Sequence, residues 1–434
     1  MVIIFMPVWL IFFIIFIRKK SERIYNPILW LFIGWSFSFG LYCFSGINYK
    51  YKLSLQAGLY YWGIFFFAYL GYAVSKRVAI KSRKKHKRII PDLKFISDGT
   101  YKIYTIIVLL GAVMTVGDIL RLNSISMSLH GSINLSAISS LGILFTGLGL
   151  ILWLNEIIRA IVMDDKIRFT AYLNIIGYLV PALITSGRQS ILIFAVASLI
   201  AIFYGHSRNK HYSYTMYLIL PFAIGGIILF LYITIISSAR TVVANKIALF
   251  NYMYNCTLSD ETTTLLDKMG IFRTFVMETI YYYSHELSMF EILFRYYDGP
   301  KFWGMSQLTL LSRNIPAGSG QSVYDLLWVY LDKVSSQAGV YNHVWRSAAG
   351  NCLTDFGLIG GQIYALVCGY VSGRFYKKCE RNQDVYQMIW LSLICTGMIF
   401  AMQFSPFCEG YWLYPIIWLL VIPFVEKMLI SQRI

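Results

Sequence analysis

The sequence predicts an all-α, polytopic membrane protein, and two observations lead to this fold class. The chain of 434 residues is 57% hydrophobic and only 14% charged, with a mean hydropathy of +0.59. That composition is far from the balance of a soluble globular domain. The apolar residues also gather into runs that are long enough to cross the roughly 30 Å hydrocarbon core of a bilayer. A soluble globular fold is therefore excluded.

We expect about eleven transmembrane helices, because each apolar run is close to the length of about 20 residues that a spanning helix needs. In chain order the runs lie near 2–17, 27–46, 57–75, 103–120, 138–158, 169–186, 189–205, 215–237, 352–372, 386–404 and 411–425. The first run has no preceding basic region and no small-residue cleavage site, so we expect it to stay in the mature protein.

The basic residues predict the orientation of these helices. RKKSER (18–23) and KRVAIKSRKKHKR (76–88) alternate with connections that carry little charge. Positive-inside logic places the basic connections and the C-terminus in the cytoplasm and the N-terminus outside. The net charge of +17 then reflects topology and contact with anionic membrane lipid, and no nucleic-acid partner is predicted.

The seven cysteines are scattered without a CxxC pair, so the sequence indicates neither a disulfide framework nor a metal site.

One connection is much longer than the others. We divide the chain into transmembrane helices 1 to 8 (1–237), a non-cytoplasmic cap (238–350) and transmembrane helices 9 to 11 (351–434). The cap is rich in aromatic residues and contains FRTFVMETIYYYSHELSMFEILF (272–294), which predicts an amphipathic helix lying against the membrane or the bundle. Its polar side would carry Glu278, Tyr282, His285 and Glu286. SVYDLLWVYLDK (322–333) reads in the same way.

Several arginines lie on the non-cytoplasmic side of this topology. Arg188 interrupts a long apolar region at TSGRQS (185–190), and Arg240 ends the eighth run at ISSARTV. A charge placed there indicates a partner, a water-filled cavity or an aqueous rim. Because guanidinium groups bind phosphate and pyrophosphate in a bidentate manner, the sequence predicts an anion site. The cap adds Arg273, Arg295, Arg313 and Arg346, and for the first three of these the alternative is pairing with an acidic neighbour.

Histidines and aromatic residues of the cap are candidates for the remaining chemistry. His343 and His285 could each accept a proton near neutral pH, and a structural role is the alternative for both. Flat aromatic faces could contact sugar rings or could anchor the protein at the membrane interface. These aromatic residues are the Tyr281, Tyr282 and Tyr283 run with Trp303, Trp328 and Trp345.

Together TSGRQSIL, ISSAR, the long outer loop and YNHVWRSAAGNCLTDFGLIGGQIYALVCGYVSG resemble the oligosaccharide repeat unit polymerases, the Wzy-type O-antigen polymerases. The resemblance implies an integral-membrane glycosyltransferase of the GT-C type that needs neither a metal nor a cofactor. It would lie in the bacterial inner membrane with its active site facing the periplasm. The donor would be a growing glycan on undecaprenyl pyrophosphate, the acceptor a lipid-linked repeat unit, and a chain-length regulator a further partner.

The resemblance also implies roles for individual residues of this chain. Arg188 and Arg240 would hold the donor pyrophosphate, with Arg346 or Arg273 assisting. His343 is the preferred base, and Glu278 or Asp355 could substitute for it. The sugar site would contain Tyr281, Tyr282, His285 and Trp345.

Two other functions remain open. A polysaccharide flippase or other transporter would also use many helices and buried arginines, and we argue against it because the sequence shows no internal repeat and no charge deep in its spans. An O-antigen ligase would share the fold and the arginines but would use lipid A core as acceptor.

Gly357, Gly361, Gly369 and Gly373 form two GxxxG spacings in one span, which predict close helix packing.

Overall fold

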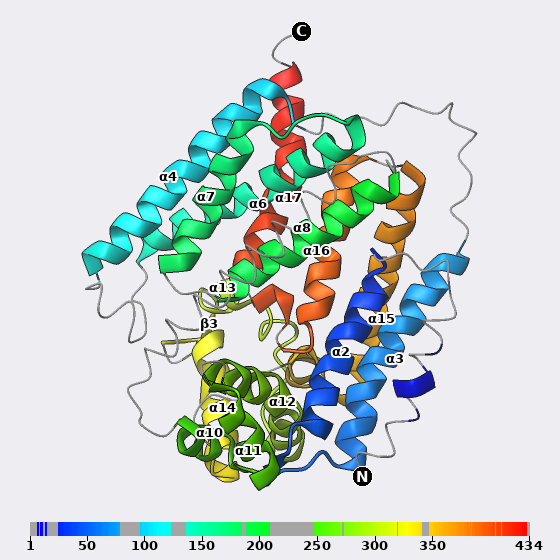
Figure 1. The fold of residues 1–434 in the computed structure, drawn as a ribbon, viewed down its shortest axis with the longest axis vertical. Coiled ribbons are helices and arrows are strands. Elements are labelled where there is room, and N and C mark those ends of the chain that lie inside the picture. The colour runs from blue at the N-terminus through cyan, green and yellow to red at the C-terminus, as the bar shows by residue number, and fades with distance from the viewer. Residues whose placement is uncertain are drawn as a thin grey trace. The chain divides into compact units, whose positions relative to one another are not determined.

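The structure is a computed structural model in which most of the chain is α-helical (Figure 1). Fourteen α-helices and two short antiparallel strand pairs make up the described part of the chain. The described residues are 7, 9–11, 14, 25–78, 96–122, 136–184, 188–208, 246–270, 273–318, 320–340, 347–382, 384–403, 405–408 and 410–431.

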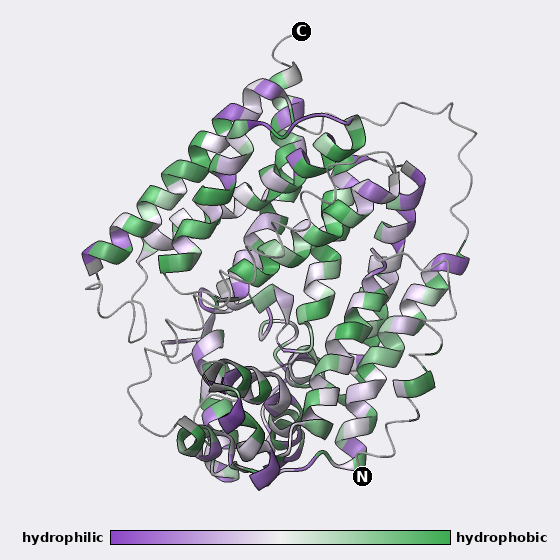
Figure 2. Cartoon of the chain, in the orientation of Figure 1, coloured by the Kyte–Doolittle hydropathy of each residue, from purple (hydrophilic) through white to green (hydrophobic). Residues whose placement is uncertain are grey.

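Seven of the described helices are long and apolar enough to cross a membrane. They are α2 (Pro27–Phe44), α3 (Leu55–Arg77), α4 (Asp98–Leu122), α6 (Ala137–Met163), α8 (Arg188–Arg208), α15 (Ala348–Asn382) and α17 (Gly410–Ser431). Two shorter apolar helices are α7 (Phe169–Ile184) and α16 (Val385–Phe400). Figure 2 shows apolar residues along α4 and α7 and hydrophilic residues at the ends of α4. The chain is a multi-pass membrane protein.

These nine helices coincide with apolar runs expected from the sequence. The runs expected at 2–17 and 215–237 lie outside the described residues, apart from residues 7, 9–11 and 14. The total of eleven spans therefore stays a prediction.

The contacts divide the chain into two compact units. Unit 1 contains residues 1–78, 243–374 and 397–409, and unit 2 contains 79–242, 375–396 and 410–434. The segment expected as a cap belongs mostly to unit 1, together with α2, α3 and most of α15. It is therefore packed with spanning helices that come from both ends of the sequence.

Within unit 1 the described part of the expected cap consists of short helices, one long helix and three short strands, one of which pairs with a strand outside the cap. The helices are α10 (Lys246–Tyr254), α11 (Asp260–Lys268), α12 (Arg273–Tyr296), α13 (Thr309–Ser312) and α14 (Val323–Ala338). Strand β1 (Ile47–Tyr49) pairs with β2 (Cys256–Leu258), and β3 (Pro316–Gly318) pairs with β4 (Gln321–Ser322). A 3₁₀ turn, η3, covers Pro406–Cys408. Because β1 lies between α2 and α3, its pairing ties that connection to the chain after α10.

Capping residues explain where several helices begin. The side chain of Asn26 accepts a hydrogen bond from the amide of Ile28, and Pro27 occupies the first turn of α2. Helix α14 begins with a capping box in which Ser322 and Asp325 satisfy each other's backbone amides. It ends at Gly339, which adopts a left-handed conformation with φ 65°. The sequence therefore specifies these boundaries locally.

Helix α12 differs from the amphipathic helix that the sequence predicts. Every side chain from 284 to 293 is buried, so this part of the helix has no exposed face. The physical reason is that α12 is surrounded, since it contacts α2, α3, α10, α11, α14 and β1. The helix packs against the bundle, which is one of the two predicted positions. The polar side chains His285 and Glu286 lie in the interior, so the predicted polar side is not exposed over this stretch.

Gly369 and Gly373, the second GxxxG pair of α15, pack closely against α3, which confirms the predicted close helix packing for these two glycines. Gly357 of the first pair lies instead at a break in the helix. A Cβ atom at Gly369 would overlap the carbonyl group of Ala68, and one at Gly373 would overlap the hydroxyl of Ser75. The contact is reciprocal, because a Cβ atom at Gly71 would overlap the carbonyl of Leu366. Small residues thus let the two helix backbones touch.

Helix α15 is interrupted near its beginning. Gly357 has φ 72° and ψ −166°, a conformation that side-chain-bearing residues rarely adopt. The carbonyls freed by the break find donors elsewhere: Trp303 N–H donates to Asp355 at 3.0 Å, and the Tyr60 hydroxyl donates to Gly357 at 3.2 Å. The break is therefore stabilised by groups from other parts of unit 1.

Unit 2 contains α4, α6, α7, α8, α17 and most of α16. Helices α4 and α6 meet through glycines, because a Cβ at Gly111 would lie 2.8 Å from the carbonyl of Gly142. Buried polar side chains pair across helices: Asn174 of α7 donates to Tyr101 and Thr105 of α4, each at 3.2 Å. Such bonds satisfy polar groups where water is scarce.

Candidate functional site

Only one of the four arginines predicted to bind pyrophosphate has a described side chain. Arg188 is the first residue of α8, but its side chain lies outside the described part, as do Arg240 and Arg346 entirely. Arg273 begins α12, where its side chain is 44% exposed and forms an ion pair with Asp267 at 3.0 Å. The convergence of the four guanidinium groups therefore stays a prediction.

Two other cap arginines pair with neighbours. Arg295 donates to the carboxylate of Glu291 at 2.8 Å, and Glu291 also accepts from the amide and the hydroxyl of Ser54. Arg313 lies 4.5 Å from the ring centroid of Tyr324. Arg273 and Arg295 therefore pair with acidic neighbours, which is the alternative to anion binding that the sequence left open.

Asp355 is the predicted site residue with the most complete surroundings. Its side chain is fully buried in α15, just before the break at Gly357. One carboxylate oxygen accepts the Ser306 amide at 2.9 Å, and the other accepts the Ser306 hydroxyl at 2.8 Å and Gln307 Nε2 at 3.0 Å. These bonds attach the loop between α12 and α13 to the interrupted helix.

The hydrogen bonds continue beyond Asp355 into a polar cluster. Gln307 Oε1 accepts from the Ser405 hydroxyl at 2.7 Å and from the Tyr364 hydroxyl at 3.2 Å. We call Ser306, Gln307, Asp355, Tyr364 and Ser405 the Asp355 cluster. A carboxylate that already accepts three hydrogen bonds is well placed to fix the geometry of the loop and the helix that it joins.

The predicted sugar-contact residues on α12 are largely enclosed. Tyr281 has no exposed surface, stacks on Phe250 with ring centroids 5.1 Å apart and donates its hydroxyl to Asn251 at 2.6 Å. His285 is also fully buried. Tyr282 is half-buried, whereas Glu278 is buried in the second turn of the helix. Tyr281 and His285 therefore cannot contact a sugar in this arrangement.

The other two predicted residues of this chemistry, His343 and Trp345, lie outside the described residues. Their roles as base and sugar contact stay predictions. Among the described residues, no group of three or more His, Cys, Asp or Glu side chains could hold a metal ion.

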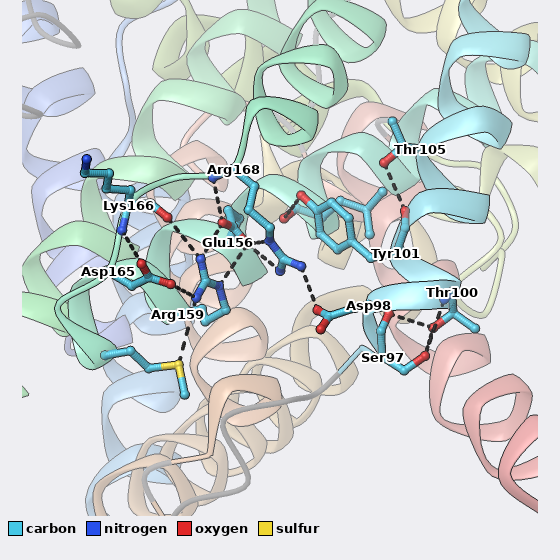
Figure 3. A network of polar contacts seen from close by, with 12 residues as sticks. Ser97, Asp98, Thr100, Tyr101, Thr105, Glu156, Arg159, Asp165, Lys166 and Arg168 are labelled. Atoms are coloured by element: carbon cyan, nitrogen blue, oxygen red, sulfur yellow. Dashed lines mark hydrogen bonds and ion pairs between the residues drawn. The ribbon is translucent and has the colours of Figure 1, made fainter.

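A second polar centre lies in unit 2 and was missed by the sequence reasoning (Figure 3). Glu156 of α6 is fully buried and accepts from Arg159 Nη2 at 2.8 Å and from Arg168 Nη2 at 2.6 Å. Arg159 also pairs with Asp165 at 2.5 Å, and Arg168 pairs with Asp98 at 2.8 Å. The sequence pattern could have indicated this ion pair, because Glu156 is a lone acidic residue in an apolar run and an arginine follows three residues later.

An open pocket of about 630 Å³ lies beside this ion-pair network. Its lining includes Asp98, Tyr101, Lys102, Arg159 and Arg168. The guanidinium groups of both arginines already donate to carboxylates, and Figure 3 shows these bonds converging on Glu156. The network therefore joins α4, α6 and the start of α7 and leaves the arginines few donors for a ligand.

Comparison with protein-family models, curated proteins and solved structures gives no match.

Proposed function

We propose that this protein is a lipid-linked oligosaccharide polymerase of the bacterial inner membrane. It would transfer a growing glycan from undecaprenyl pyrophosphate onto a new lipid-linked repeat unit at the periplasmic face. The proposal rests on the resemblance carried by TSGRQSIL, ISSAR and the stretch from Tyr341 to Gly373. The observation that supports it best is the position of Arg188 at the start of α8.

That position suits a pyrophosphate for two reasons. The N-terminus of a helix presents unpaired amide groups and the positive end of the helix dipole, both of which favour an anion. Arg188 adds a guanidinium group at the same end of this apolar helix of 21 residues. Arg240, with Arg346 or Arg273, would complete the pyrophosphate contacts.

The chemistry needs charge stabilisation and one proton acceptor. The acceptor hydroxyl attacks the anomeric carbon, the bond from that carbon to the pyrophosphate oxygen breaks, and undecaprenyl pyrophosphate leaves. Arginines that are already in place stabilise the charge that develops on the leaving group. The hydroxyl proton passes to a base, for which His343 is our choice. We assign Asp355 a positioning role, because its carboxylate already accepts three hydrogen bonds.

Variants of Arg188 test the proposal in a deletion strain complemented at matched membrane abundance. We expect Arg188→Ala to reduce polymer formation by about 100-fold, the typical effect of removing one preorganised donor. Arg188→Lys should also shorten the polymer, since an ammonium group cannot bind in a bidentate manner. The control is Arg121→Ala, which removes a 65% exposed arginine on the same predicted side of the membrane. The measurement is a gel of cell-surface polysaccharide.

Three outcomes separate the functions. Loss of the ladder to a single repeat on lipid A core supports a polymerase that needs Arg188. Loss of every repeat supports a ligase or a flippase. An unchanged ladder with Arg188→Ala contradicts the proposal.

A transporter is the second candidate, because two observations favour it. Asp355 and Glu156 are fully buried in the spanning helices α15 and α6, whereas we expect no charge deep in the spans from the sequence. In addition, α15 is broken at Gly357, and interrupted helices form the sites of many transporters. A flippase for lipid-linked sugars would use the same helices, and the gel distinguishes it by loss of every repeat.

A further inference from the structure

Helix α12 carries two adjacent buried titratable side chains that the proposed chemistry does not use. The side chain of His285 is fully buried, and that of Glu286 is 1% exposed. His285 Nδ1 lies 2.8 Å from the carbonyl oxygen of Tyr281. Because a carbonyl oxygen can only accept, Nδ1 carries a hydrogen and donates it. In a neutral imidazole, Nε2 is then the nitrogen with the lone pair.

Nε2 lies near the carboxyl group of Glu286. Nε2 and Oε1 are 3.8 Å apart, and among the described residues neither Nε2 nor either carboxyl oxygen has a hydrogen-bond partner. A deprotonated carboxylate beside a nitrogen lone pair would be repelled. The pair therefore needs one proton, which lies either on Nε2, giving an ion pair, or on Glu286, giving a neutral pair.

The surroundings favour the neutral pair. The titratable groups on the elements around α12, and on α12 itself, are mostly uncharged at neutral pH: Tyr42 and Cys43 of α2, Tyr61 of α3, Tyr49 of β1, Tyr254 of α10, and Tyr281, Tyr282 and Tyr283 of α12. Tyr254 stacks on the imidazole with ring centroids 4.4 Å apart. An ion pair with no further hydrogen bonds in such a site would not recover the cost of removing both charges from water.

The charged side chains that the structure describes on these elements are paired, exposed or distant along a helix, apart from Glu278. Arg273 and Arg295 pair with Asp267 and Glu291, and the remaining carboxylate on α12 is Glu278. The charged residues of α11 and α14 are exposed: Asp260, Glu261, Asp267, Lys268, Asp325, Asp332 and Lys333. Lys76 and Arg77 of α3 follow Tyr61 by on the order of 20 Å of helix. Burial accordingly raises the pKa of Glu286 well above its usual range and lowers the pKa of His285 to about 4.

We propose that His285 and Glu286 form a buried proton-binding site, in which the carboxyl group of Glu286 holds the proton and faces Nε2 of His285 as its acceptor. The separation of 3.8 Å is about 1 Å longer than a direct O–H···N bond, so the two groups must approach by that amount to form one. The ligand is a single proton, and its loss would leave an uncompensated charge in the interior of unit 1.

Infrared spectroscopy of the full-length protein in detergent tests the site directly. A protonated carboxylic acid has a carbonyl stretching band that a carboxylate lacks. We expect the wild-type protein to keep such a band at neutral pH, Glu286→Gln to lose it and the control Glu278→Gln to keep it. A wild-type protein without the band at neutral pH would overturn the proposal, whether or not the variants fold.

The unfolding temperature provides a second readout. Glu286 has a pKa of 4.5 when unfolded and a raised pKa when folded, so it contributes stability at low pH that is lost as pH rises above about 4.5. His285, whose pKa falls from 6.5 to about 4 on folding, has the opposite slope only between those values. Above about pH 7, Glu286 should therefore be the only one of these two groups that changes the stability with pH.

Glu286→Gln mimics the neutral acid and removes this titration. We expect its unfolding temperature to rise relative to that of the wild-type protein by roughly 1–2 °C per pH unit above about pH 7. If Glu286 instead pairs as a carboxylate with a charged His285, the variant will be less stable than the wild-type protein at neutral pH. That result would contradict a neutral pair.

Discussion

Asp355, Glu156 and Glu286 are buried carboxyl groups with three different kinds of neighbour. Asp355 accepts three hydrogen bonds from Ser306 and Gln307, and Glu156 accepts from two arginines. Glu286 has no hydrogen-bond partner among the described residues, and we infer that it keeps its proton. Each arrangement answers the same physical problem, because a bare carboxylate in a dehydrated interior is very unfavourable.

Replacing Glu156 tests the ion-pair network of unit 2. We expect Glu156→Ala to lower the free energy of unfolding by about 3–5 kcal/mol, because it leaves two largely buried guanidinium groups without their shared carboxylate. Their side chains are only 13% and 30% exposed. Thermal unfolding of the purified protein in detergent measures the effect.

The matched control for that variant is Asp165→Asn. Asp165 pairs with Arg159 from a side chain that is 56% exposed, so water can replace the interaction and stability should change little. Equal losses for the two variants would show that burial of Glu156 is not the cause.

At the scale of elements, glycine determines how α3 and α15 pack and where α15 breaks. Gly369 and Gly373 let the two backbones meet, while Gly357 adopts the positive φ at the break. The GxxxG spacing is readable from sequence, because it depends only on residues of one helix. The break was not predicted, since the donors that stabilise it, such as the hydroxyl of Tyr60, come from distant parts of the chain.

A pair of alanine substitutions separates packing from helix propensity. Gly369→Ala should destabilise the protein by about 1–3 kcal/mol, because the added methyl group overlaps the carbonyl of Ala68. Gly40→Ala in α2 meets no atom within 4 Å and should be neutral or stabilising, since alanine favours helix by about 1 kcal/mol. Unfolding temperatures of both variants check this, and a stabilising Gly369→Ala would rule out the close contact.

At the scale of the whole molecule, the distribution of charge predicts the orientation in the membrane. The strongly basic connections alternate with connections of little charge, which places 238–350 outside and the connection at 164–168 inside. The structure adds exposed positions at which this can be measured, including Glu261 in α11 and Lys166 after α6.

Single cysteines in a background without the seven native cysteines test this orientation. If the protein lies in the bacterial inner membrane as proposed, a membrane-impermeant maleimide should label Glu261→Cys in intact spheroplasts. Lys166→Cys should react only after that membrane is opened. The reverse pattern would invert the topology and place the proposed site in the cytoplasm.

The sequence by itself determined the membrane class, the positions of nine described apolar helices and the glycine contact of α15. These follow from composition, run length and spacing, which are local properties of the chain. Only the tertiary structure decided that His285 and Tyr281 are enclosed, that Glu156 binds two arginines and that Asp355 holds the loop at Ser306. Burial and pairing depend on segments far apart in sequence, and the same helical pattern on α12 fits a surface or an interior until its neighbours are known.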